Sequence, residues 1–492
     1  MADDTGRKCY WLLFALFFIS YGYFFQGGGW NQNSRLCLTR AIIEHGTFAI
    51  DAYKEDAPGM EFVNAGDWAY YDGHYYSNKS PGLSFMAVPF FAAAQALAAR
   101  IIPGDPGRQV LVSAYVSTVC TVGLLSALLC LLIFYIFHRV FSMSANAAML
   151  LAVLYGFGTL AFSYSTTFYS HQPAACCAFL SFVLAMNIRY GAAPRKTMMA
   201  VLAGFSAASA VVIEPSAMIM LAGVAFCLVS VREGRSYIPL YLLGCILPLT
   251  VLGWYNYVCF GHPLASGYTY SNDMVMWKVE GKLFGLPGLR RFYDLLISPH
   301  RGLFFSSPVL LMALPGLFIA LRRRQWLSEI LFCAVISGVF IVFIACFHAW
   351  HGGWAAGPRY LLPAFPWIFM MAGLALPRFP RAFMGIGLLS LLINLAITIV
   401  GNEIPLEVKN PLFDVVWKNL IAGRVSINPF PLSHCADYTM AEMARVETWR
   451  ANFSSFNLGE LLFPYSIASV LPLAVFWAVW GYWWRKIVCH HR

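Results

Sequence analysis

The sequence predicts an all-α polytopic membrane protein with about 12 to 13 transmembrane helices. Three observations predict this class: 59% of the residues are hydrophobic, only 11% are charged, and long apolar segments recur along the chain. The basic residues lie in short loops between the apolar segments rather than along one polar face. The net charge of +10 therefore indicates membrane orientation and not a nucleic-acid partner.

The apolar segments have the length needed to cross about 30 Å of hydrocarbon. The first follows Arg7 and Lys8 and precedes no small-residue cleavage site, which favours an uncleaved span over a signal peptide. The two segments that flank Glu214-Pro215 could also form one kinked span. The candidate helices are residues 9–25, 82–102, 110–136, 146–165, 173–190, 198–213, 215–231, 237–259, 303–321, 328–347, 360–376, 383–400 and 464–484.

The basic loops favour a topology in which residues 82–102 do not cross the membrane. That segment is then a re-entrant or interfacial helix, and the small residues of "AAAQALAAR" suit packing on protein. The basic loops then all fall on the cytoplasmic side with the N-terminus. This topology divides the chain into a transmembrane module (1–400, with the active site in the exterior loop 26–109), a short exterior segment (401–463) and a last span with a basic cytoplasmic tail (464–492).

The first exterior loop combines a predicted helix with a turn. "SRLCLTRAIIEHG" has the apolar spacing of a short amphipathic helix lying on the membrane, with Arg35 near its start and Gly46 at its end. "NKSPG" supplies a tight turn that can fold the loop back onto the helices. Other exterior segments place histidine, arginine and aromatic residues at membrane depth. Carboxylates beside arginine, lysine and histidine are the groups needed to bind a phosphate and to activate a hydroxyl.

The first loop resembles a known family. "SRLCLTRAIIEHGTFAID" followed by "GDWAYYDGHYYSNKSPGLSFMAVPFF" is similar to the first exterior loop of GT-C glycosyltransferases, especially bacterial aminoarabinose transferases and protein O-mannosyltransferases. Tyr76, Lys79 and Pro81 match the family's Y-x-x-K-P-P turn, with Ser80 in place of the first proline. The resemblance implies that Lys79 and Tyr76 contact the phosphate of a polyprenyl-phosphate sugar, and that the helix after the turn does not cross the membrane.

One departure concerns the catalytic base. Family members carry an acidic pair shortly after the first span, whereas this chain has Asn31-Gln32-Asn33 there. Either another carboxylate has taken over the role, with Asp51 preferred to Asp67, or the chain has lost transferase activity.

These observations predict a membrane glycosyltransferase that moves a sugar from a polyprenyl-phosphate carrier to an acceptor glycan, lipid or protein at the exterior face of a bacterial inner membrane. The alternatives are a lipid or glycan flippase or transporter, and a non-catalytic scaffold of the same fold. A divalent cation is left open. The predicted site residues are Asp51 and Asp67 for catalysis, Lys79, Tyr76, Arg35, Arg359 and His171 for the donor phosphate, and Asp72, His351, Trp354 and Tyr360 for acceptor or sugar.

Overall fold

The computed structural model describes residues 2–54, 65–190, 195–230, 232–272, 278, 282–427 and 454–489. Each predicted apolar segment contains helix, which confirms the all-α class. The last helix begins at Leu471, later than predicted. The first half of the chain contains α1 (Ala2–Gly22), α4 (Pro106–Thr118), η3 (Val119–Gly123), α5 (Leu124–Tyr135), η4 (Ile136–Val140), α6 (Ala145–Gly158), α7 (Ala161–Tyr164), α8 (His171–Tyr190), α9 (Lys196–Ile213), η5 (Pro215–Ala217), α10 (Met218–Val229), α11 (Arg232–Arg235) and α12 (Ile238–Phe260).

The second half continues the same helical bundle, in shorter pieces where serine and proline interrupt it. At Ser307-Pro308, for example, an apolar segment changes from α-helix to 3₁₀-helix. Its elements are η6 (Gly267–Tyr270), α14 (Leu289–Leu296), α15 (Leu303–Ser306), η7 (Pro308–Met312), α16 (Ala313–Arg323), α17 (Leu327–Cys346), η8 (Arg359–Ala364), α18 (Phe365–Gly373), α19 (Pro380–Val400), η9 (Pro411–Val416), α20 (Trp417–Ile421), η11 (Leu458–Leu461), η12 (Ile467–Val470) and α23 (Leu471–Cys489).

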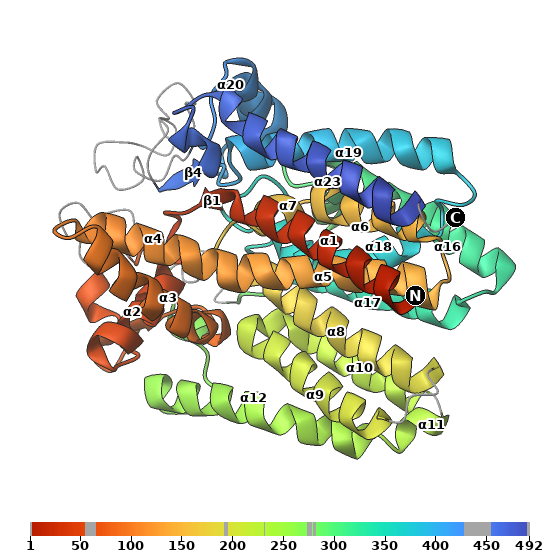
Figure 1. Ribbon diagram of the computed structural model, residues 1–492. Helices are drawn as coiled ribbons and strands as arrows, with labels where there is room; N and C mark the ends of the chain where they lie inside the picture. The colour runs from red at the N-terminus through yellow and green to blue at the C-terminus, as the bar shows by residue number, and fades with distance from the viewer. Residues whose placement is uncertain are drawn as a thin grey trace.

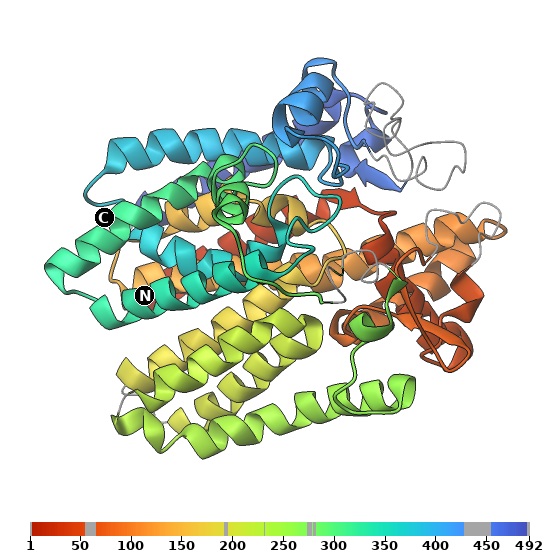
Figure 2. The same cartoon turned by 180° about the vertical axis from the view of Figure 1, so that it is seen from behind.

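The long helices run between two ends of the bundle (Figure 1). Both termini lie at one end, together with α11 and the turns α16–α17 and α18–α19, and we call it the terminal end (Figures 1 and 2). The opposite end, which we call the site end, holds the first loop. Its elements are β1 (Phe24–Gln26), α2 (Trp30–His45), η1 (Asp51–Tyr53), β2 (Trp68–Tyr71), β3 (His74–Ser77), α3 (Gly82–Ile101) and β4 (Ser455–Asn457).

Within the described residues, eight helices are long and apolar enough to cross a membrane, and two shorter apolar helices accompany them. Side chains of α12 such as Leu243 and Leu247 are more than half exposed, as expected of a surface that faces lipid. The basic turns gather at the terminal end, where the predicted topology places the cytoplasm. The chain is thus a multi-pass membrane protein.

Residues 82–102 form a helix, α3, that has the length and composition of a span. The structure nevertheless places α3 at the site end with α2, packed against α2 and the first part of α4 (Figure 1). The chain therefore enters the site end at β1 and leaves it with α4, as the topology with a non-crossing segment predicts. At residues 198–231, α9 and α10 are separate helices that both pack on α8, so the single kinked span is wrong.

Two small antiparallel sheets hold the site end together. In one, β1 pairs with β4, with Phe25 opposite Phe456, so the end of the first helix is joined to the C-terminal segment. In the other, β2 and β3 form a hairpin with Trp68 opposite Ser77. This hairpin leads directly into Asn78 and Lys79.

Candidate active site

Helix α2 turns its polar residues inward. Gly46 ends it in the left-handed conformation (φ 63°), as predicted. The predicted amphipathic helix lying on the membrane is wrong, however, because residues from Gln32 to Ala41 are buried against protein. Polar side chains are buried when they have partners or ligands to meet. The inner face of α2 therefore forms one wall of a polar site.

Lys79 and Asp67 form a buried ion pair. Lys79 Nζ lies 3.0 Å from Asp67 Oδ2, and the lysine is only 4% exposed. The turn before α3 holds Lys79 in place, and its ammonium faces the ring of Tyr268 at 5.6 Å. The structure thus brings together the predicted phosphate contact and one of the two predicted carboxylates.

A second network joins Arg35 to Glu214. Arg35 donates through Nη2 to Ser170 Oγ at 2.9 Å, and Ser170 Oγ donates to Glu214 Oε2 at 2.5 Å. His171 Nδ1 lies 3.4 Å from the same carboxylate oxygen. Burial opposes ionisation of Glu214, but the hydrogen bonds from His171 and Ser170 and the charge of Arg35 hold its pKa down at about 2. Glu214 is therefore ionised and committed to these partners.

Arg359 stacks on an aromatic residue next to this network. Its guanidinium lies 4.6 Å from the ring centre of Tyr169 and 5.5 Å from that of Tyr360. His171 packs between these residues, stacked on Tyr169 and edge-on to Tyr360. We call Arg35, Asp67, Lys79, His171, Glu214 and Arg359 the buried cluster.

Several nitrogen atoms of the buried cluster have no hydrogen-bond acceptor among the described residues. They are Nε of Arg35 and Nε and Nη1 of Arg359. Nε2 of His171, whose Nδ1 faces Glu214, also has no hydrogen-bond partner among these residues. The three side chains are 2%, 6% and 3% exposed, so water does not reach them freely. Buried donors without acceptors are rare in folded proteins. The arginine donors come from α2 and η8 and leave a place for an acceptor-rich ligand.

Sequence reasoning missed Glu403, a carboxylate of the C-terminal segment. It is 6% exposed and accepts from Tyr169 Oη at 2.6 Å and from Gln32 Nε2 at 2.7 Å. Nearby Asn402 donates to Thr167 Oγ1 at 2.9 Å and fixes the chain before Glu403. Burial raises the pKa of Glu403. In the sequence, Glu403 is a single acidic residue after an apolar span, and no local pattern indicates that this segment contacts α2.

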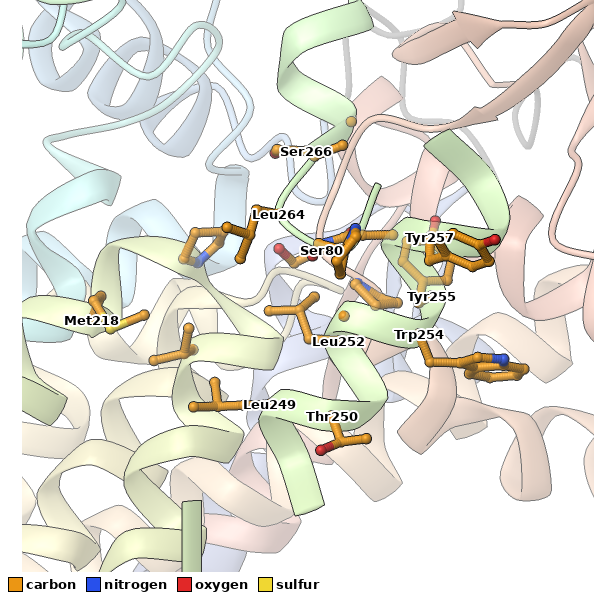
Figure 3. A pocket seen from close by; sticks show the side chains of 18 of the residues that line it. Ser80, Met218, Leu249, Thr250, Leu252, Trp254, Tyr255, Tyr257, Leu264 and Ser266 are labelled. Carbon is orange, nitrogen blue, oxygen red and sulfur yellow. The ribbon is translucent and has the colours of Figure 1, made fainter. Parts of the chain in front are cut away.

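An apolar cavity of about 870 Å³ begins beside Lys79. Helices α9 and α12 pack closely at Gly204 and Gly244, where a Cβ on either glycine would collide with the facing backbone. Nearer the site end, the cavity lies between α12 residues from Ile246 onward and Val211, Pro215 and Met218. Figure 3 shows Leu249 and Thr250 at its lower side, with Ser80 and Ser266 at its upper side. The cavity therefore connects a membrane-facing apolar surface with the turn that carries Lys79.

A smaller cavity of about 170 Å³ lies on the other side of Pro215, which lines both. Its polar wall consists of His171 and Glu214. Its aromatic wall consists of Tyr268, Phe284, Phe343, Phe347 and Tyr360. A polar group at one side and aromatic faces at the other suit a sugar ring, which has both hydroxyls and apolar C–H faces.

Three of the predicted site residues lie away from the buried cluster. Asp51 is exposed at the hairpin, where its oxygens meet His74 Nδ1 at 2.8 Å and the amide of Tyr75 at 2.6 Å. Asp72 is an exposed residue of the hairpin turn, with φ 48°. Tyr76 packs edge-on against Phe260 rather than toward the cluster.

The remaining predicted residues lie near Arg359. His351 is buried in the loop before it and accepts from the amide of Gly353 at 2.9 Å. Arg301 holds this loop through carbonyl groups, including that of His351 at 3.2 Å. Burial, with the nearby charge of Arg301, lowers the pKa of His351 to about 3, so its ring is neutral. Trp354 is half-buried in the same loop, and Tyr360 lines the smaller cavity.

The part of the chain that the structure describes contains no group of three or more side chains spaced to bind a metal ion. Four carboxylates of the first loop could offer oxygen ligands to a cation: Asp51, Glu55, Asp56 and Asp67. Of these, Glu55 and Asp56 lie outside the described residues. Asp51 and Asp67 have the separate partners given above.

Comparison with protein-family models finds no match, and no curated protein is significantly similar to the chain. Several solved structures are similar. ArnT from Cupriavidus metallidurans in the apo state matches with a TM-score of 0.48 and 16% identity, over 78% of this chain and 60% of that one. ArnT bound to undecaprenyl phosphate matches with a TM-score of 0.49 and 15% identity, over 81% and 64%.

The archaeal oligosaccharyltransferase AglB from Archaeoglobus fulgidus, solved with an inhibitory peptide and a dolichol-phosphate, matches with a TM-score of 0.43 and 12% identity, over 81% of this chain and 56% of that one. ArnT is an aminoarabinose transferase, and ArnT and AglB are both GT-C superfamily members. The chain spans about 60% of the length of ArnT. The similarity lies in the layout of the helices.

Proposed function

We propose that this protein is a membrane glycosyltransferase that moves a sugar from a polyprenyl-phosphate carrier to an acceptor hydroxyl. The observation that carries the proposal is the set of buried donors without acceptors on Arg35 and Arg359, placed beside an apolar cavity that begins at Lys79.

A phosphate fits this set by charge and by geometry. A buried cationic group without an acceptor is costly, about 1–3 kcal/mol or more for each lost hydrogen bond. A phosphate diester offers oxygens to several donors at once, and arginine binds it with two parallel hydrogen bonds. Within the buried cluster, three cationic side chains accompany two carboxylates. Arg359 has no carboxylate ion-pair partner among the described residues.

The larger cavity fits the lipid part of the donor. Its lining from α12 is apolar and continues to side chains that face lipid, such as Ile246. A polyprenyl chain can lie there with its phosphate near Lys79, because the turn at Ser80 brings the lysine to the end of the cavity. Burial of each CH₂ of such a chain contributes about 0.8 kcal/mol.

The smaller cavity fits the transferred sugar. Tyr268 connects the two cavities, since its ring faces Lys79 and also lines the aromatic wall. A sugar bound there places its anomeric carbon next to the phosphate oxygen. As the bond to that oxygen breaks, negative charge develops on the phosphate, and the fixed cations stabilise it.

The site faces the cell exterior in this proposal. The basic turns at the terminal end favour a cytoplasmic position for that end. The site end then lies at the opposite face of what we propose to be a bacterial inner membrane. The acceptor, a glycan, a lipid or a protein, reaches the site from that side.

The test is transfer or hydrolysis of a panel of radiolabelled polyprenyl-phosphate sugars by the purified protein in lipid. We expect turnover of at least one donor. Arg359→Gln should abolish it, whereas Arg378→Gln, which changes an exposed arginine at the terminal end, should not. Absence of turnover with every donor, together with movement of a labelled donor across the bilayer, would instead establish the transporter alternative. Absence of both turnover and movement across the bilayer would favour the non-catalytic scaffold.

A further inference from the structure

Glu403 lies at the start of α2. A Cβ on Gly29 would collide with both carboxylate oxygens of Glu403, so the carboxylate lies directly against the start of α2. Gln32, one of the three amide residues at positions 31–33, donates to it at 2.7 Å. The C-terminal segment therefore delivers a carboxylate to the start of α2, where the first loop has amides.

Glu403 also lies close to Arg359. Tyr169 presents its ring to Arg359 at 4.6 Å and its hydroxyl to Glu403 at 2.6 Å, so a single side chain separates the guanidinium from the carboxylate. On the other side, Gln32 follows Asn31, whose main-chain oxygen accepts from Arg35 Nη1 at 3.1 Å.

One oxygen of Glu403 is available. Both hydrogen bonds go to Oε1, and Oε2 has no hydrogen-bond partner among the described residues. The other carboxylates at the site are committed: Asp67 to Lys79 at 3.0 Å, and Glu214 to Ser170 and His171. A general base needs an oxygen that can reach the proton it removes. Oε2 of Glu403 is therefore free to accept a proton.

Building on the proposed function, we propose that Glu403 is the general base of the transfer reaction. The acceptor oxygen attacks the anomeric carbon and forms the new C–O bond as its proton passes to Oε2 of Glu403. The bond from the anomeric carbon to the phosphate oxygen breaks, and its electron pair stays on the phosphate. The products are the glycosylated acceptor and the polyprenyl phosphate, and the proton then leaves Glu403 to solvent.

The environment of Glu403 suits a base. Burial raises its pKa, while hydrogen bonds from Tyr169 and Gln32 and the charge of Arg359 limit the rise. A carboxylate with a raised pKa accepts a proton more readily than one held near 2, as Glu214 is. The base acts in its ionised form, so the transfer rate should fall as pH decreases through this raised pKa.

The test compares Glu403→Gln with Glu407→Gln, an exposed glutamate four residues along the same segment. We expect Glu403→Gln to lower kcat for transfer by about 10²–10⁴-fold. Donor affinity, measured with the polyprenyl-phosphate sugar that wild type uses, should change by no more than about threefold, because the buried cluster stays intact. Glu407→Gln should match wild type. In Glu403→Asp, which keeps the carboxylate, the acidic limb of the pH profile should remain.

Three results would overturn the assignment. The first is an unchanged kcat in Glu403→Gln. The second is a parallel loss of kcat, donor affinity and thermal stability in both Glu403→Gln and Glu403→Asp, which would show that the carboxylate only fixes α2. The third is an acidic limb that persists in the residual activity of Glu403→Gln. Wild-type turnover is measured first, so a failure of the proposed transferase activity is distinguishable from a failure of Glu403 as its base.

Discussion

The two ends of the bundle hold their cationic residues in opposite ways. At the terminal end, Arg323 and Arg378 are exposed next to turns. At the site end, Arg35, Arg359 and Lys79 are buried beneath the first loop. Exposed arginines orient a membrane protein through their number and need no partners. Buried ones require acceptors, and the proposed phosphate would supply them at the site end.

The largest expected effect concerns the buried ion pair. Lys79→Met leaves the Asp67 carboxylate buried without its cation, which should cost about 3–5 kcal/mol of stability. The measurement is the thermal unfolding temperature of each variant in the same detergent. Lys79→Met with Asp67→Asn should regain much of the loss, because no charge is then left alone. Equal loss in the single and double variants would mean that the pair does not act as a unit.

A smaller effect separates the two groups of arginines. Arg359→Gln should lower kcat/KM for a lipid-phosphate sugar by at least about 10²-fold, because it removes donors that meet the phosphate. Arg378→Gln should change it by less than twofold, within about 0.4 kcal/mol. Similar losses of kcat/KM in both variants would show that the buried arginine has no greater role in catalysis than the exposed one.

The apolar cavity should contribute less. Leu252→Trp fills part of the cavity and should weaken binding of a long-chain donor by about tenfold, or about 1.4 kcal/mol. A water-soluble short-chain analogue should be unaffected. Leu243→Trp, on the lipid-facing side of the same helix, is the matched control. Equal effects on long and short chains would place the lipid elsewhere.

The smallest effect is expected at the hairpin. Asp51→Asn weakens an exposed pair with His74, so stability should change by less than about 1 kcal/mol. Transfer should stay within about twofold of wild type, since Asp51 lies apart from the buried cluster. A large loss of transfer would instead identify Asp51 as the general base.

The sequence was sufficient for features that depend on local pattern. Apolar length predicted the helices, Gly46 predicted the end of α2, and the basic turns predicted which segments share a side. Lys79 was found through a turn motif, and it does lie beside the larger cavity.

What the sequence missed depends on contacts between distant segments. The apolar spacing of α2 suggested a helix facing lipid, but burial of its polar residues is decided by α3, α8 and the segment after α19. Asp51 looked suitable because it ends a loop helix, yet hydrogen bonds from the hairpin hold it at the surface. Glu403 lies 371 positions from Gln32, and no local pattern relates the two.

Phosphate binding by the buried cluster can be measured by titrating the purified protein in lipid nanodiscs with a polyprenyl phosphate and with the corresponding neutral polyprenol. If the buried cluster binds phosphate, the phosphate should bind at least about tenfold more tightly than the alcohol in wild type. That preference should disappear in Arg359→Gln and persist in Arg378→Gln. Equal affinity of the wild-type protein for the phosphate and the alcohol would show that the buried cluster does not bind phosphate.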